Sequence, residues 1–192
     1  MPLVFFLLLA VQAFSFSTVV IDPGHGGNDG GAYHKGVKEA DLNLKVARKL
    51  KKELERKGMK VVMTRYSDQT MSITTRANIA NRYPNSILVS IHFNGHRSSQ
   101  PRGIETFYVS STGRRIASQI QSRLISALKS KNRGIKYTTG LSLLTKTKAP
   151  AVLVECGFLS NSYERNRCNT DWYQTVTARK IAEGIVAYKK SR

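Results

Sequence analysis

The sequence lacks the features that divide a chain into several domains or leave it unfolded. It has no Pro- or Ser-rich linker, no internal repeat and no low-complexity tract, and 41% of its 192 residues are hydrophobic. That composition is ordinary for a globular protein and excludes intrinsic disorder. The length suits one domain with a sizeable core.

Acidic residues are scarce, since 12 Asp and Glu stand against 31 Lys and Arg, which gives a formal net charge of +19. A surface of this charge attracts polyanions, and nucleic acid, anionic lipid and acidic wall polymers all qualify. Much of the charge lies in residues 45–52, where no aromatic residue is interleaved with the basic ones. Stacking aromatics are typical of nucleic-acid binders, so we expect no nucleic-acid partner.

Long apolar runs are also missing, and the run at the start of the chain is short. Residues 1–11 read MPLVFFLLLAV, too short to cross a bilayer, with no Lys or Arg before the apolar stretch. The run has the length of a signal-peptide core, and residues 11–13 (VQA) fit a small-x-small cleavage site. We predict a leader at residues 1–17, a catalytic domain at 18–192, and export to the periplasm or cell envelope. A buried N-terminal helix is the alternative.

The sequence contains two cysteines, Cys156 and Cys168, and neither a CxxC pair nor an HExxH helix. The compact signatures that indicate zinc on their own are therefore absent. The two cysteines would suit a disulfide in an exported protein or two separate thiols, so they leave the compartment open.

Apolar patterns alternate along the rest of the chain. Short apolar runs predict strands at residues 18–22, 59–64, 86–92, 103–109 and 151–155. Helical spacing predicts helices at residues 39–57, 72–83, 114–129 and 171–189. This order predicts a single α/β domain with three α/β/α layers and a mostly parallel central sheet.

Ionisable side chains follow the ends of the predicted strands. His25 follows the first strand among glycines, His92 ends the central strand, Glu155 ends the last, and Glu39 begins the first helix. Because such sheets place their sites at the carboxyl ends of the strands, we expect these four groups to converge. Two imidazoles and a carboxylate are a common ligand set for catalytic zinc, and another carboxylate nearby can move protons.

Seven strings carry a family resemblance. They are VVIDPGHGGNDGGA (19–32), KEADLNLKVARKL (38–50), VVMTR (61–65), LVSIHFNGH (88–96), GIETFYVS (103–110), RGIK (133–136) and AVLVECGFLSN (151–161). In this order they resemble the zinc-dependent N-acetylmuramoyl-L-alanine amidases of the amidase-3 type, the catalytic domains that split septal peptidoglycan. The resemblance covers nearly everything after the predicted leader.

The resemblance implies roles for matching residues. His25, Glu39 and His92 would bind one Zn²⁺, and Glu155 would be the catalytic carboxylate. Asn94 takes the place of the asparagine in the family's SIHxN string, where it is a candidate substrate-binding residue or a turn residue that caps the loop. The implied reaction is hydrolysis of the amide between N-acetylmuramic acid and L-Ala of the stem peptide, as in cell-wall remodelling and daughter-cell separation.

The partners that follow are peptidoglycan and, through the basic surface, anionic envelope polymers or a membrane surface. Some family members carry an autoinhibitory helix after the strand that matches residues 103–110. Here only residues 111–113 intervene before the predicted helix, so we expect no built-in plug, while an activator protein is still compatible with the sequence.

Other readings stay open. A zinc carboxypeptidase or endopeptidase that cuts within the stem peptide would use the same metal chemistry. A serine acylase is disfavoured because the SxxK string at residues 126–129 lies in a predicted amphipathic helix, and because Lys146-Thr147-Lys148 stands in place of a KTG string. A non-enzymatic protein that binds polyanions or nucleic acid is the remaining alternative. We interpret His34 and His96 as surface histidines, and Arg133 as a solvated arginine in preference to a contact with the peptide carboxylate.

Overall fold

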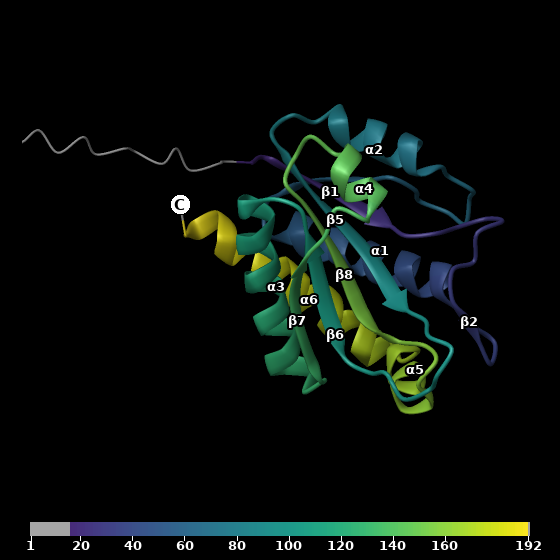
Figure 1. Ribbon diagram of the computed structural model, residues 1–192. Helices are drawn as coiled ribbons and strands as arrows, with labels where there is room; N and C mark the ends of the chain where they lie inside the picture. The colour runs from purple at the N-terminus through teal and green to yellow at the C-terminus, as the bar shows by residue number, and fades with distance from the viewer. Residues whose placement is uncertain (1–15, 192) are drawn as a thin grey trace, which may run out of the picture.

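The apolar runs of the sequence form the strands of the central sheet. The computed structural model describes residues 16–191 (Figure 1), in which six strands form one sheet in the order β4-β1-β5-β8-β6-β7. The strands are β1 (Thr18–Pro23), β4 (Lys60–Met63), β5 (Ser86–Asn94), β6 (Ile104–Tyr108), β7 (Asn132–Tyr137) and β8 (Ala151–Phe158). The first four in this order are parallel, whereas β6 is antiparallel to β8 and parallel to β7.

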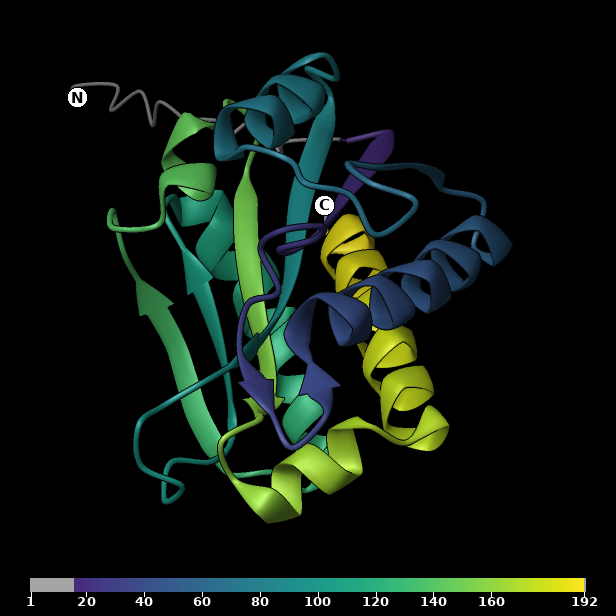
Figure 2. The same ribbon diagram turned by 90° about the vertical axis from the view of Figure 1, so that its right-hand side faces the viewer.

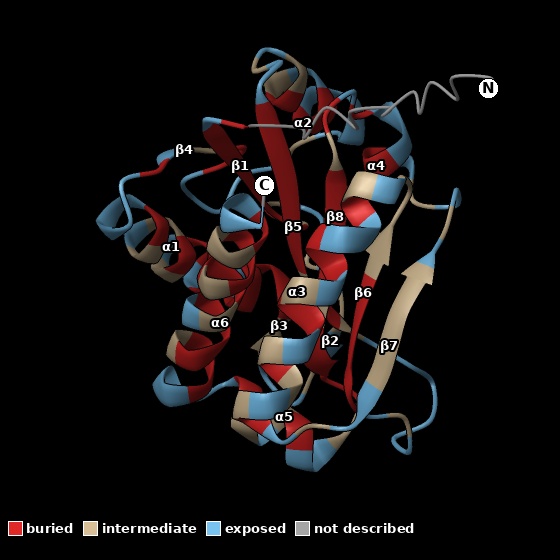
Figure 3. Ribbon diagram, turned by 90° about the vertical axis from the view of Figure 1, so that its left-hand side faces the viewer, coloured by how far each residue is buried: buried red, intermediate tan, exposed pale blue. Residues whose placement is uncertain are grey.

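Helices cover the two faces of the sheet unequally. The long helices α1 (Glu39–Arg56), α3 (Ser111–Leu128) and α6 (Asp171–Lys190) pack on one face and enclose the larger part of the core (Figure 3). The short helices α2 (Ile73–Asn81) and α4 (Ser142–Lys146) lie together on the other face (Figure 2). Helix α5 (Ser162–Cys168) follows β8, and a small hairpin joins β2 (Tyr33–His34) to β3 (Val37–Lys38). The predicted three-layer α/β fold is confirmed.

The unequal cover leaves part of the sheet open, and this opening positions the site. Leu88 on β5 and Ala151 and Leu153 on β8 pack beneath α2 and α4. Because alternate residues of a strand face the same side, His92 and Glu155 point to that same face. They lie nearer the carboxyl ends of their strands, which the two short helices do not cover.

Most sequence predictions of secondary structure are confirmed, with shifted ends. Ser72 caps α2 by accepting a hydrogen bond from the backbone N–H of Thr75, as expected. Four features were not predicted: the β2–β3 hairpin, β7, α4 and α5. The strand predicted at residues 103–109 lies next to the edge of the sheet, as β7 pairs outside it.

The predicted leader falls largely outside the described residues. Of residues 1–17 only Phe16 and Ser17 are described, and Phe16 is 2% exposed and stacks on Tyr188 of α6. Phe16 therefore packs with the folded domain. Within residues 16–191, no helix combines the length and the hydropathy that crossing a membrane requires.

Candidate metal centre

Three potential metal ligands come from separate elements. His25 lies in the loop after β1, Glu39 is the first residue of α1, and His92 is near the end of β5. Glycines let these groups approach one another. A Cβ atom on Gly24 would lie 2.2 Å from atoms of the His92 ring, and one on Gly31 would lie 2.5 Å from Oε2 of Glu39. The glycines around His25 therefore make room for the other two side chains.

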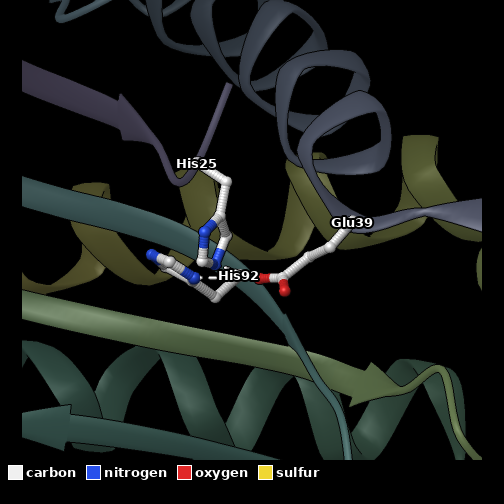
Figure 4. Close-up of side chains that lie close together, drawn as sticks. All are labelled: His25, Glu39 and His92. Atoms are coloured by element: carbon white, nitrogen blue, oxygen red, sulfur yellow. Dashed lines mark hydrogen bonds and ion pairs between the residues drawn. The ribbon is translucent and has the colours of Figure 1, made fainter. Parts of the chain in front are cut away.

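The rings of His25 and His92 both approach one carboxylate oxygen of Glu39 (Figure 4). Oε1 of Glu39 lies 3.2 Å from Nε2 of His25 and 2.9 Å from Nδ1 of His92. One ligand atom from each residue lies within 4.8 Å of the others. The two rings are 4.8 Å apart and nearly perpendicular, with an interplanar angle of 79°. Of the four groups expected to converge, these three form one cluster.

Hydrogen bonds to neighbouring groups orient His25 and Glu39, as such bonds orient the ligands of metals in proteins. Nδ1 of His25 lies 2.8 Å from Oδ2 of Asp29, and Oε2 of Glu39 accepts a hydrogen bond of 2.8 Å from the backbone N–H of Ala32. A metal-binding histidine commonly donates its second ring nitrogen to a carboxylate in this way. The donor set and its support therefore fit a divalent cation held by two imidazoles and one carboxylate.

The ionisation of these groups reflects their proximity. The hydrogen bond to Glu39 raises the pKa of His25 to about 9, assisted by Asp29 and opposed by burial. Burial would raise the pKa of Glu39, but hydrogen bonds and charge from His25 and His92 hold it well below its usual range. In the metal-free protein His25 is thus protonated at neutral pH, and metal binding must displace that proton.

Glu155 lies beside the cluster without belonging to it. On β8 it is in register with His92 of β5 on one side and with Glu105 of β6 on the other. Its Oε2 atom is buried and has no hydrogen-bond partner among the described residues. Burial, followed by the negative charges of Glu39 and Glu105, raises the pKa of Glu155 well above its usual range. A buried, unpaired carboxyl group of this kind is poised to exchange protons.

Glu105 is a site residue that sequence reasoning missed. Its side chain is buried and accepts hydrogen bonds of 2.9 Å from Nδ2 of Asn94, 2.8 Å from Nε of Arg133 and 2.5 Å from Nζ of Lys136. Burial would raise its pKa, but these hydrogen bonds, with that of Lys136 the strongest, lower it. A glutamate inside the alternating string GIETFYV was the available signal.

One sequence interpretation changes here, that of Arg133, and another, that of Asn94, stays open. Asn94 contacts Glu105 through its side-chain amide, so its role as a substrate-binding residue stays a prediction. Arg133, interpreted as solvated, instead forms an ion pair with Glu105 and lies over the ring of Phe158. His34 and His96 lie outside the cluster, and His96 is exposed, as expected. Cys156 and Cys168 are both buried and free.

A buried ion pair fixes the loop that carries His25. Asp22, at the end of β1, pairs with Arg76 at 2.8 Å and accepts hydrogen bonds from the hydroxyls of Thr64 and Ser90. Arg76 also donates to the backbone carbonyls of Pro23 and His25, at 2.7 Å and 2.6 Å. Helix α2 is thereby tied to the loop, which positions the first histidine.

A cavity of about 160 Å³ opens beside the two histidines. Apolar side chains from the segment before α2, from α2, from the α4 region and from β8 line much of it, namely Met71, Ile73, Leu141, Leu143 and Leu153. A cavity of this size and polarity accommodates a small apolar group. The cluster thus combines a cation site, an unpaired carboxyl group and an adjacent apolar recess, which suits hydrolysis of a bond next to a small apolar substituent.

Comparisons with known proteins agree with this geometry. The family model described as N-acetylmuramoyl-L-alanine amidase matches residues 19–187. The chain is 34% identical over 175 residues to the N-acetylmuramoyl-L-alanine amidase LytC of Bacillus subtilis (strain 168), which covers 89% of this chain and 35% of LytC. The chain therefore spans only about a third of that relative.

Solved structures of similar proteins superpose over almost the whole chain. An N-acetylmuramoyl-L-alanine amidase from Clostridium difficile 630 has a TM-score of 0.88 and 36% identity, covering 93% of this chain and 99% of its own. The catalytic domain of CwlV, an N-acetylmuramoyl-L-alanine amidase from Bacillus (Paenibacillus) polymyxa var. colistinus, has a TM-score of 0.87 and 33% identity, covering 92% and 100%. The similarity thus extends over a complete catalytic domain.

Proposed function

The chain belongs to the amidase-3 family and carries the catalytic domain of an N-acetylmuramoyl-L-alanine amidase, a hydrolase of peptidoglycan, and we propose that it works with one Zn²⁺ held by His25, Glu39 and His92. The observation that carries the proposal is the convergence of two ring nitrogens on one oxygen of Glu39. Two imidazoles and one carboxylate are a usual set for catalytic zinc. When bound, the cation would lower the pKa of a water molecule and polarise the scissile carbonyl group.

Glu155 would move the proton in this reaction. Its carboxyl group is in register with His92 and has an oxygen without a partner, so a water molecule and an amide nitrogen can use it. In the proposed mechanism Glu155 accepts a proton from the attacking water and then donates it to the departing amine of L-Ala. Burial raises the pKa of Glu155, which favours the protonated form that donates to the departing amine.

The identity of the scissile bond is the part of the proposal that most needs a test. A carboxypeptidase or endopeptidase that cuts within the stem peptide would use the same groups, whereas the family match favours the amide to N-acetylmuramic acid. The test is mass spectrometry of the products that the full chain releases from purified peptidoglycan, with Glu155→Gln and a chelated sample as controls. Intact stem peptides with a free L-Ala amine, absent in both controls, are the expected result. Shortened stems still attached to muramic acid would establish a peptidase instead.

We also propose that the leader directs export and is cleaved within residues 1–17, after the VQA site at residues 11–13. Family members act outside the cytoplasm, and the apolar start of the sequence fits a leader. N-terminal sequencing of the protein recovered from the cell envelope tests this. A start before Phe16 would agree with the packing of Phe16 on Tyr188, and an intact Met1 would refute the proposal.

The role in wall remodelling and daughter-cell separation is part of the same proposal. Helix α3 begins at Ser111, directly after β6 ends at Tyr108, so no inserted segment lies there to cover the metal centre. The purified chain should therefore be active without displacement of any part of itself. An activator that works by moving a segment of this chain would contradict this.

A further inference from the structure

A second pocket lies where β8 ends and where β6 and β7 begin. Its volume is about 440 Å³, within the range of ligand-binding pockets. Its walls carry four cationic side chains, Arg102, Lys129, Lys131 and Arg167. They come from three segments: the connection before β6, the connection between α3 and β7, and α5. No residue that lines this pocket lines the cavity beside the histidines.

One of these cations is fixed in place. Nη2 of Arg167 donates a hydrogen bond of 2.6 Å to the carbonyl oxygen of Leu128 at the end of α3. Its guanidinium group lies 5.4 Å from the ring centre of Tyr163 and 5.2 Å from that of Tyr173. An arginine held in this way loses little conformational entropy when it binds an anion, and its remaining N–H groups suit phosphate oxygens.

The acidic residue in the pocket, Glu164, bonds backbone groups and not the cationic side chains. Glu164 is buried, and its two oxygens accept hydrogen bonds of 2.8 Å from the backbone N–H groups of Gly103 and Phe158. It ties the start of β6 to the end of β8. Within residues 16–191, Arg102, Lys129 and Lys131 form no ion pair with a carboxylate. Four cationic side chains against one carboxylate leave the pocket with a net positive charge.

A purely structural role would explain only part of this arrangement. Basic residues stabilise the carboxyl end of a helix, and Arg167 does so at α3, which Lys129 directly follows. Arg102 lies in the connection before β6 and Lys131 lies two positions beyond Lys129, and both are exposed. Burial of apolar surface does not require them there.

We propose that this pocket binds the phosphate groups of a polyanion, at a site separate from the metal centre. The pocket lies at the same end of the sheet as Glu155, because the backbone N–H of Phe158, three positions along β8, is held by Glu164. A bound polymer would keep the enzyme at an anionic surface. This inference does not depend on the scissile bond.

The test measures binding of inorganic tripolyphosphate to the full chain by calorimetry at physiological salt. The double variant Arg102→Gln/Lys131→Gln removes two charges from the pocket, and Lys45→Gln/Lys52→Gln removes two exposed charges from α1 as the matched control. We expect saturable binding of one tripolyphosphate per chain, with a Kd raised about tenfold or more in the pocket variant and nearly unchanged in the control.

Three outcomes would overturn the proposal. Equal weakening in both double variants would mean general attraction by the net charge. Absence of saturable binding would mean that no site exists. Loss of binding in His25→Ala, with the pocket variant unaffected, would place the phosphate at the metal centre. If tripolyphosphate binds as expected, a poly(glycerol phosphate) and free inorganic phosphate then distinguish a polymer from a small anion as the source, and preference for free phosphate would refute the polymer.

Discussion

The buried pair of Asp22 and Arg76 offers a sharp test of how the site is held. In Asp22→Asn the amide can still accept a hydrogen bond from Thr64 or Ser90, but it cannot neutralise Arg76, whose side chain is 5% exposed, against 1% for Asp22. Removing one partner of a buried ion pair costs about 3–5 kcal/mol, because the other charge stays buried. That is a large part of the roughly 5–15 kcal/mol by which domains are stable.

The assay is urea unfolding of the full chain in the presence of a chelator, so that metal binding does not contribute. With an m-value of about 2–3 kcal/mol/M, the unfolding midpoint should fall by about 1–2.5 M. Asp171→Asn is the matched control, since Asp171 also pairs with a cation, Lys49, but on the surface. Its midpoint should barely change, because exposed ion pairs contribute little.

The pH dependence gives an independent check of the same reasoning. Burial would raise the pKa of Asp22, but the charge of Arg76 and hydrogen bonds from Thr64, Arg76 and Ser90 lower it below the ordinary value of 3.8. A lowered pKa means that the ionised form stabilises the fold. The stability advantage of the wild type over Asp22→Asn should therefore be complete above pH 3.8 and decline as the pH falls below it. A stability loss under about 1 kcal/mol, or one as large in Asp171→Asn, would refute the account of the pair.

Four further predictions concern the catalytic face. Glu155→Gln should lower kcat by about 10²–10⁴-fold in product-release assays, because an amide cannot exchange protons with water and the departing amine; activity within tenfold of the wild type would contradict this. Glu105→Gln should reduce kcat more than it alters KM, because it leaves Arg133 and Lys136 without their carboxylate partner beside Glu155. Full activity of this variant would show that Glu105 does not influence Glu155. Gly24→Ala should abolish metal binding in a chelator competition because its Cβ would meet the His92 ring at 2.2 Å, whereas Gly140→Ala, with its nearest contact at 3.5 Å, should bind normally. Apparent metal affinity should fall up to about tenfold per unit as pH drops below about 9, the pKa of His25, and a flat profile would show that no proton is displaced.

Local patterns in the sequence carry much of the fold. Strands β1, β5 and β8 are buried along most of their length, so each appears as a continuous apolar run. Helices α1, α3 and α6 are long enough for a clear apolar face. Edge strand β7 carries no such run because most of its residues are only half-buried, and α4 and α5 are too short to show a period.

The three residues of the candidate metal centre could also be predicted from the sequence, but for a different reason. His25, Glu39 and His92 each sit in a string that resembles the amidase-3 family, and each follows or precedes an element that the pattern predicts. Their convergence could be predicted from one rule, that sites in parallel sheets lie at the carboxyl ends of the strands. The structure confirms that the three lie together, while their binding of zinc stays a proposal.

Sequence alone thus determined the fold class, the family and the three residues of the candidate metal centre, because apolar period and local strings depend on residues near one another in the chain. Only the tertiary structure decided that β6 pairs antiparallel to β8, which places Glu105 opposite Glu155 and draws Arg133 and Lys136 toward it. It also brought the cations of three segments around one pocket. Strand pairing and loop packing join residues far apart in sequence, so no local pattern specifies them.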